Sequence, residues 1–186
     1  MIVTLIVICE VGFWVLLAAG LCLRYLARMP RLGAAVLLCE PLLEVVLLVV
    51  TAVDLKNGAA PDWKHGLAAV YIGFTVGYGH YTVSRIDARF QHRFAGGPPP
   101  VLPPKSGPAR ARHERRLWVR TVVAAAVACA LLQGAIWYVG DGGGDASSLA
   151  GWQGTALKAV LIHGLVALAY TLWPGKEPVD AGSPKP

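Results

Sequence analysis

Two glutamates, Glu40 and Glu44, stand inside an apolar stretch, residues 37–54, whose composition is that of a membrane span. A carboxylate near the centre of a bilayer costs at least about 2.5–3.5 kcal/mol on insertion scales, so it marks either a functional site or a tight pairing. Because the two residues are four positions apart, a helix places them one turn apart on the same face. Thr51 and Asp54 continue that face, so an otherwise apolar helix carries one polar stripe.

Other residues that could do chemistry are expected at a similar depth in the membrane. With a rise of about 1.5 Å per residue, Glu10 in the first apolar run and Glu44 in the second both come out near the middle of the bilayer. Glu40 comes out one turn nearer the cytosol. The sequence therefore predicts one layer, about one turn thick, whose members are the three glutamates, Lys158, His163, Tyr71 and Phe74.

This layer has the components of an acid catalyst. Several carboxyl groups that lie close together at low dielectric should not all ionise, which leaves at least one protonated near neutral pH. A protonated carboxyl in an apolar pocket can act as a Brønsted acid, and aromatic faces stabilise the cation that protonation forms. Protonation-initiated cyclisation of an isoprenoid chain needs this combination. In this hypothesis the proton donor is Glu44 or Glu10, with Glu40 as the third candidate. The expected substrate-binding side chains are Trp14, Tyr71, Phe74, Tyr78 and His163.

The same glutamates have other interpretations. They could pair with Lys158, His163 or backbone groups and fix the bundle, or they could belong to a proton or ion relay or to a substrate carrier. A carboxylate–histidine metal site is the remaining option, but bundle di-iron sites use a Glu-x-x-His spacing, which this sequence lacks, as it lacks HExxH. We therefore predict no metal and no other cofactor. The alternative to an enzyme is a non-enzymatic membrane protein, either a proton-linked carrier or an assembly partner.

The composition places these residues in an integral membrane protein. Of the 186 residues, 55% are hydrophobic and 15% are charged, whereas soluble domains carry roughly 25% charged residues. We predict an all-α membrane bundle with five transmembrane helices, which lie at about residues 2–23, 32–53, 63–84, 117–139 and 149–173. A basic, proline-rich loop at 85–116 joins the third and fourth spans; within it, residues 85–95 are a candidate extension of the third helix and residues 109–116 look like the basic start of the fourth. The tail 174–186 is predicted to be disordered.

The basic residues set the orientation. The connections after the first and third spans carry three and eight Lys or Arg residues, and those after the second and fourth carry two and none. By the positive-inside rule, we expect a multi-pass protein of the inner (plasma) membrane with its N-terminus outside and its C-terminus in the cytosol. Because the basic residues cluster between spans, the net charge of +6 reflects topology and contact with the lipid bilayer. Nucleic-acid binding is not expected.

The third span has two faces at helical spacing. Tyr71 and Tyr78 belong to an aromatic stripe, whereas Gly73 and Gly77 make a small-residue face. Small residues let membrane helices approach closely, so we expect the glycine face to pack against a neighbouring helix. The aromatic face would then border a cavity or lipid. On the second span, Pro41 lies between the two glutamates and removes a backbone donor, which predicts a kink there.

The segment WKHGLAAVYIGFTVGYGHYTVSRIDARFQHRFAGGPPP (residues 63–100), together with ARHERRLW (111–118), resembles a group of small multi-span membrane proteins of actinomycetes. This likeness covers most of the chain. A second likeness, in size, in five spans and in membrane carboxylates such as Glu10 and Glu44, is to membrane-bound terpene cyclases of actinomycete natural-product pathways. That resemblance implies the cyclisation of a prenylated, farnesyl-type substrate by protonation.

Overall fold

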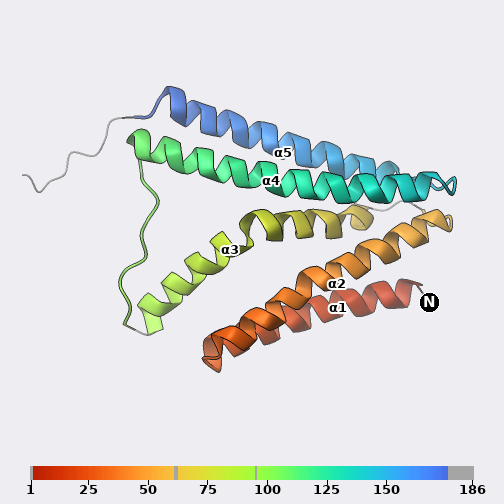
Figure 1. Ribbon diagram of the computed structural model, residues 1–186, viewed down its shortest axis with the longest axis horizontal. Helices are drawn as coiled ribbons and strands as arrows, with labels where there is room; N and C mark the ends of the chain where they lie inside the picture. The colour runs from red at the N-terminus through yellow and green to blue at the C-terminus, as the bar shows by residue number, and fades with distance from the viewer. Residues whose placement is uncertain (1, 61–62, 95, 176–186) are drawn as a thin grey trace, which may run out of the picture.

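The computed structural model describes residues 2–60, 63–94 and 96–175, with every side chain in these ranges except those at positions 2, 3, 5–7, 9, 10, 64, 65 and 94. This part of the chain contains five long α-helices and no strand, which confirms an all-α fold. The helices are α1 (Ile2–Leu21), α2 (Pro30–Lys56), α3 (Leu67–Phe94), α4 (Gly107–Gly140) and α5 (Ser147–Leu172) (Figure 1). A π-helical turn, Cys22–Leu26, prolongs α1, and a short 3-10 helix, Trp63–Gly66, precedes α3.

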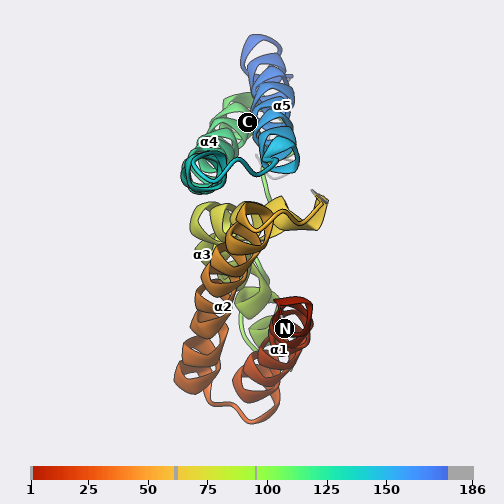
Figure 2. The same ribbon diagram turned by 90° about the vertical axis from the view of Figure 1, so that its right-hand side faces the viewer.

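The helices form a row in which each one packs against the next along the chain. Figure 2 shows α4 and α5 on one side, α3 in the middle, and α1 and α2 on the other side. The most extensive packing joins α4 to α5, α3 to α4, and α1 to α2. Helix α3 is therefore shared by the two halves, because it contacts α2 on one side and α4 on the other.

The helices run roughly side by side, and the buried core lies at one end of their length, where α2 and α4 end and α3 and α5 begin. Its members are small or branched apolar residues: Leu48, Ala52, Leu55, Ala68, Ala69, Leu132, Ala135, Val139 and Leu149. At the same end the Trp152 indole donates a hydrogen bond of 2.6 Å to the carbonyl of Trp63 and ties α5 to the start of α3. Towards the other end, α3 bends away from α4 and runs to the turn between α1 and α2 (Figure 1). We call this other end, which carries most of the arginines, the basic end.

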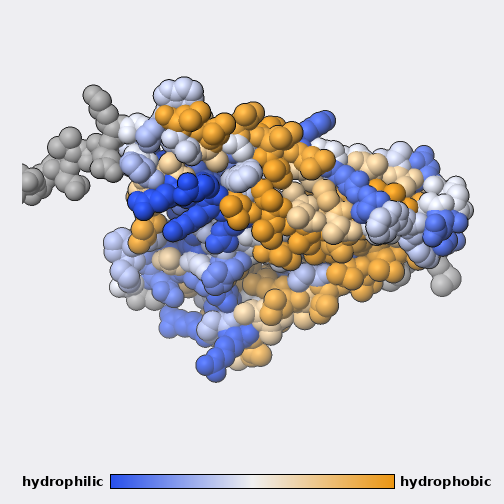
Figure 3. Space-filling model, turned by 45° about the horizontal axis from the view of Figure 1, so that its top comes forward, coloured by the Kyte–Doolittle hydropathy of each residue, from blue (hydrophilic) through white to orange (hydrophobic). Residues whose placement is uncertain are grey.

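Within the part of the chain that the structure describes, three helices are long and apolar enough to cross a membrane, namely α2, α4 and α5, and a shorter apolar helical stretch covers Val11–Leu26. Many of their large apolar side chains are exposed, and Figure 3 shows a broad apolar region between two more hydrophilic ends. Such a surface is suited to lipid rather than to water. The protein is a membrane protein, and the expected count of five spans stays a prediction.

Helices α3 and α4 extend beyond the expected spans. Helix α3 continues ten residues past position 84, to Phe94, and α4 begins ten residues before position 117, at Gly107. Most of the basic residues of 85–116 therefore lie on helices that prolong the apolar segments. Helix α2 runs through Pro41 without interruption. The tail predicted to be disordered lies outside the described residues from position 176 onward.

The glycine face of α3 packs closely against α4, as predicted. A Cβ atom added to Gly77 would lie 2.6 Å from the carbonyl oxygen of Arg120 and 2.9 Å from the Cβ of Ala124. A Cβ added to Gly73 would collide with the carbonyl oxygen of Ala124. Only residues without a side chain let the two backbones approach this closely. The two glycines thus fix the position of α3, which carries the aromatic stripe.

Candidate functional site

Glu40 and Glu44 are both buried where α2 meets α3. Their exposed fractions are 5% and 8%. The Tyr71 hydroxyl of α3 donates a hydrogen bond of 2.9 Å to Oε2 of Glu40, while Oε1 of Glu40 is buried without a hydrogen-bond partner among the described residues. Glu44 lies one turn further along α2, within electrostatic reach of the same phenol. We call Glu40, Glu44 and Tyr71 the glutamate cluster.

Aromatic rings of α1 cover the glutamate cluster. The Phe13 ring meets the Tyr71 ring edge to face, with centroids 5.0 Å apart, and meets the Trp14 ring in the same manner at 5.4 Å. Trp14 is 67% exposed and faces the surroundings of the protein. An acid, its phenol partner and two further rings therefore lie together.

Glu10 belongs to the same helix as these rings. It lies in α1 three residues before Phe13, but its side chain is outside the described part of the chain. Its role as a proton donor therefore stays a prediction.

A second polar group joins α3, α4 and α5 nearer the basic end. The Thr121 hydroxyl lies 2.6 Å from the Tyr78 hydroxyl and 2.6 Å from Nδ1 of His163. On the other side of the imidazole, Nε2 of His163 lies 3.9 Å from Glu114, which is buried and forms an ion pair of 2.5 Å with Arg110. These contacts make a continuous polar path across three helices, which we call the Glu114 cluster.

The single layer expected from the sequence is thus divided between two clusters. His163 joins the Glu114 cluster, because α5 packs against α4. Lys158, also on α5, is exposed. Phe74 is 51% exposed and stacks on Tyr78 at 5.2 Å, so it too borders the Glu114 cluster. Of the predicted substrate-binding residues, Tyr71 bonds Glu40 and Trp14 is linked to Tyr71 through Phe13, whereas the other three lie around Thr121.

Comparison with known proteins identifies a relative along nearly the whole chain. The uncharacterized membrane protein YmcC of Bacillus subtilis (strain 168) is 34% identical over 178 residues, which are 95% of this chain and 95% of that protein. The chain belongs to this family of membrane proteins. A membrane-protein family is therefore confirmed, whereas the assignment to a five-span family of actinomycetes and the likeness to terpene cyclases stay predictions. No family model and no solved structure matches the chain.

The Glu114 cluster was not predicted from the sequence. Glu114 is the one acidic residue in the arginine-rich stretch 109–116, which we interpreted as a basic helix start. Two spacings carried a signal: Arg110 precedes Glu114 by one turn, and Thr121 follows it by two turns on the same face. A carboxylate aligned with a hydroxyl on the membrane side of a helix indicates a polar path into the bundle.

Proposed function

We propose that this membrane protein is a terpene cyclase that protonates a farnesyl-type prenyl chain, with Glu40 as the acid. The observation that carries the proposal is the environment of the Glu40 carboxyl. One oxygen is held by Tyr71, while the other is buried and has no hydrogen-bond partner among the described residues. A proton on that second oxygen would remove the cost of a buried charge. It would also leave an acid whose O–H is not engaged by any described group.

The surroundings of Glu40 fit the steps of such a reaction. The Oε1–H bond breaks as the proton adds to one carbon of a substrate double bond, and the π electrons form the new C–H bond. The other alkene carbon becomes a carbocation, which the next double bond of the chain attacks to close a ring. The hydrogen bond from Tyr71 stabilises the carboxylate left on Glu40. Loss of a proton from the cyclised cation to that carboxylate restores the acid.

The aromatic residues support the same chemistry. The negative face of an aromatic ring attracts a cation by about 0.5–2 kcal/mol, more when water is excluded. Phe13 and Tyr71 lie beside the acid, and Trp14 extends the aromatic surface outward. Because Trp14 is exposed to the lipid, an apolar substrate dissolved in the membrane would reach these rings without crossing water. This geometry favours Glu40 over Glu44 as the donor, and Glu44 becomes a second acid one turn away.

The test is conversion of prenylated substrates by membranes that contain the protein. We expect a cyclised product of unchanged mass and shifted retention time. Glu40→Gln should lower the rate about 10²-fold or more, the usual scale of general acid catalysis. The matched control is Glu114→Gln, which changes another buried glutamate outside the glutamate cluster and should retain the activity per folded molecule. Full activity of folded Glu40→Gln would refute the assignment, and no cyclised product from any prenyl substrate would refute the cyclase.

A proton-linked carrier is the second candidate, and the Glu114 cluster favours it. Short contacts connect Tyr78, Thr121 and His163, and the imidazole lies between Thr121 and Glu114. A histidine between two such groups can pass a proton along, because it can accept a proton on one ring nitrogen and release a proton from the other. In vesicles with a pH-sensitive dye, a carrier would move protons, and His163→Gln would abolish the flux. A cyclase would show no flux in either form.

We also propose that the chain crosses the plasma membrane five times with the basic end in the cytosol. Support comes from the basic residues that gather at that end. They lie after α1, on the extensions of α3 and α4, and in the connection between these two helices. This arrangement follows the positive-inside rule. Cysteine labelling from each side of spheroplasts, at the α1–α2 turn and at the loop after α4, would test it.

A further inference from the structure

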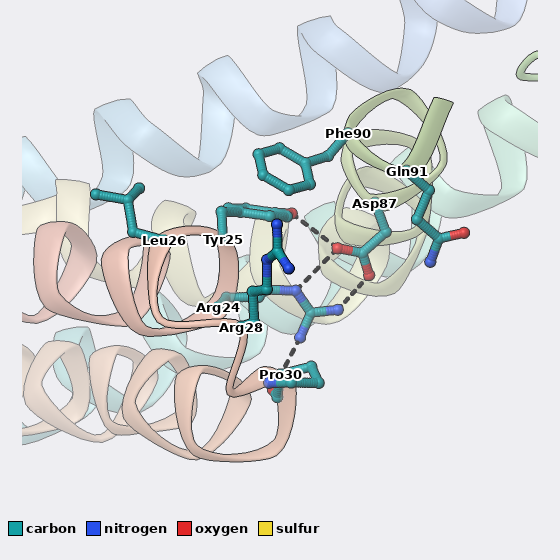
Figure 4. Close-up of a pocket in the computed structure, with 8 residues that line it drawn as sticks. All are labelled: Arg24, Tyr25, Leu26, Arg28, Pro30, Asp87, Phe90 and Gln91. Atoms are coloured by element: carbon teal, nitrogen blue, oxygen red, sulfur yellow. Dashed lines mark hydrogen bonds and ion pairs between the residues drawn. The ribbon is translucent and has the colours of Figure 1, made fainter. Parts of the chain in front are cut away.

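A cavity of about 850 Å³ lies at the basic end, between the turn that joins α1 to α2 and the last turns of α3. Figure 4 shows its lining: Arg24, Tyr25 and Arg28 come from the turn, and Asp87, Phe90 and Gln91 come from α3. The cavity is separate from both clusters described above. Its size is that of a site for a small molecule or a lipid headgroup.

One arginine of the cavity is fixed in place by α3. Arg24 donates from Nε to Oδ1 of Asp87 at 2.9 Å, pairs through Nη2 with Oδ2, and donates from Nη1 to the carbonyl of Pro30 at 3.2 Å. The Tyr25 hydroxyl donates to the same carboxylate at 2.8 Å. The Arg24 guanidinium, against the opposing effect of burial, holds the pKa of Asp87 below its ordinary value. Asp87 is therefore a charged partner of Arg24 and is not available to neutralise a second cation fully.

The second arginine of the cavity is held in an unusual conformation and is not engaged. Arg28 has a φ of 56°, in the left-handed region that residues with a side chain rarely adopt. It is exposed and forms no hydrogen bond or ion pair with the described residues. Its side chain rises from the turn towards the space between Tyr25 and Asp87 (Figure 4). With Arg24, Arg28 and Asp87 in the lining, the cavity carries one net positive charge, and that charge is on Arg28.

We propose that this cavity binds a phosphate or diphosphate group, with Arg28 as the main ligand. A free guanidinium forms two parallel hydrogen bonds to phosphate oxygens, which makes arginine the preferred residue for such anions. The Gln91 amide can donate a further hydrogen bond. Tyr25 and Phe90, whose ring centroids are 4.5 Å apart, offer an apolar wall to a chain attached to the phosphate. The site stands on its own contacts and does not depend on the role proposed for Glu40.

The test measures binding to the full-length protein purified in a neutral detergent. One arm adds inorganic pyrophosphate and follows the thermal shift; the other adds phosphatidylglycerol or phosphatidylcholine and counts bound lipids by native mass spectrometry. We expect Arg28→Gln to weaken the binding of the anionic probe about tenfold or more, because a hydrogen bond to a charged group is lost. The control is Arg31→Gln, three residues further along the chain. Like Arg28→Gln, it changes only the side chain. It removes the same charge from an exposed position that does not line the cavity.

The outcomes separate the sources of the phosphate. Binding of phosphatidylglycerol but not pyrophosphate assigns the site to a lipid headgroup, the reverse assigns it to a soluble phosphate, and binding of both supports the shared chemistry. Two results would overturn the proposal. One is the absence of preferential binding of either anionic probe; the other is an equal loss in Arg28→Gln and Arg31→Gln, which indicates a general effect of charge.

Discussion

Replacing Gly77 with alanine should separate α3 from α4. The new Cβ would lie 2.6 Å from the carbonyl oxygen of Arg120, whereas ordinary contact begins at 3.4 Å, so the backbones must move apart by about 0.8 Å. The oxygen belongs to the backbone of α4 and cannot turn away as a side chain would. Overpacking of this kind costs about 1–3 kcal/mol, against about 1 kcal/mol gained because alanine favours helix over glycine. A net loss of up to about 2 kcal/mol follows from these two values.

Gly79, two residues further on the same helix, provides the control. A Cβ at Gly79 would meet only the Cγ2 atom of Thr75, at 3.5 Å, which is an ordinary contact. In detergent, Gly77→Ala should therefore lower the melting temperature by up to about 8 °C, while Gly79→Ala leaves it unchanged or raises it. The assay is the fraction of protein that stays monodisperse after heating. Equal melting temperatures of the two variants would show that the close approach of α3 and α4 is wrong.

Three further predictions concern the polar contacts. Tyr71→Phe should destabilise the protein by about 1–3 kcal/mol, since a buried carboxyl loses its hydrogen-bond donor. The loss should be smaller when Glu40 is already leucine, and equal losses in the two backgrounds of this double-mutant cycle would exclude the contact. Thr121→Val should cost about 1–3 kcal/mol in denaturant unfolding because two partners lose a hydrogen bond, whereas Thr171→Val, whose bond stays within α5, should cost less. The pKa of Asp87 is lowered in the folded protein. Its ion pair with Arg24 therefore stabilises the fold fully above the ordinary aspartate pKa of about 3.9. This stabilisation is lost as the pH falls through the lower pKa of the folded state. In Asp87→Asn the melting temperature should no longer fall over this acidic pH range. The same dependence on pH in wild type and Asp87→Asn would contradict the stabilising role of the ion pair.

The sequence predicted the helices well because apolar runs and their basic borders determine where a membrane helix lies. It also predicted that Gly73 and Gly77 pack against a neighbour, since a small-residue face has little other use. The helix ends were less accurate. Helices α3 and α4 continue past the apolar runs, because arginine-rich segments are good helix formers in water and need no membrane to continue the hydrogen-bond ladder.

The division of the site could not be predicted from depth alone. Counting residues from the ends of the runs places a side chain at a height in the bilayer, but it does not say which neighbour the side chain meets. His163 and Glu40 were expected at one height. In the structure α5 packs against α4, so His163 meets Thr121 and Glu114, whereas Glu40 meets Tyr71. Which helices are neighbours depends on long-range packing, and a single sequence carries little information on it.

The preference among the carboxyls also changed for a physical reason. Depth favoured Glu44 or Glu10 as the acid, whereas the hydrogen bonds favour Glu40. Tyr71 is seven residues, or two turns, from Tyr78, and both belong to one stripe of α3. Because α3 lies between α2 and α4, one of these phenols reaches Glu40 and the other reaches α4. A stripe that looked uniform in the sequence therefore serves two sites.

Two buried glutamates with equal exposure, Glu40 and Glu114 at 5% each, differ in their partners. Glu114 has the guanidinium of Arg110 at 2.5 Å, and a cation at that distance compensates most of the cost of a buried carboxylate. Glu40 has a phenol on one oxygen and no described partner on the other, so no cation offsets a negative charge there. An ionised carboxylate suits a fixed structural pair, whereas a neutral carboxyl can give up a proton and recover it. If one of the two is the acid of this protein, its surroundings assign that role to Glu40, and Glu40→Asp should test it. The shorter side chain keeps the acid but moves it away from Tyr71, so a catalytic Glu40 predicts a reduced rate with a correct product. Full activity of Glu40→Asp would contradict the requirement for an acid held by Tyr71.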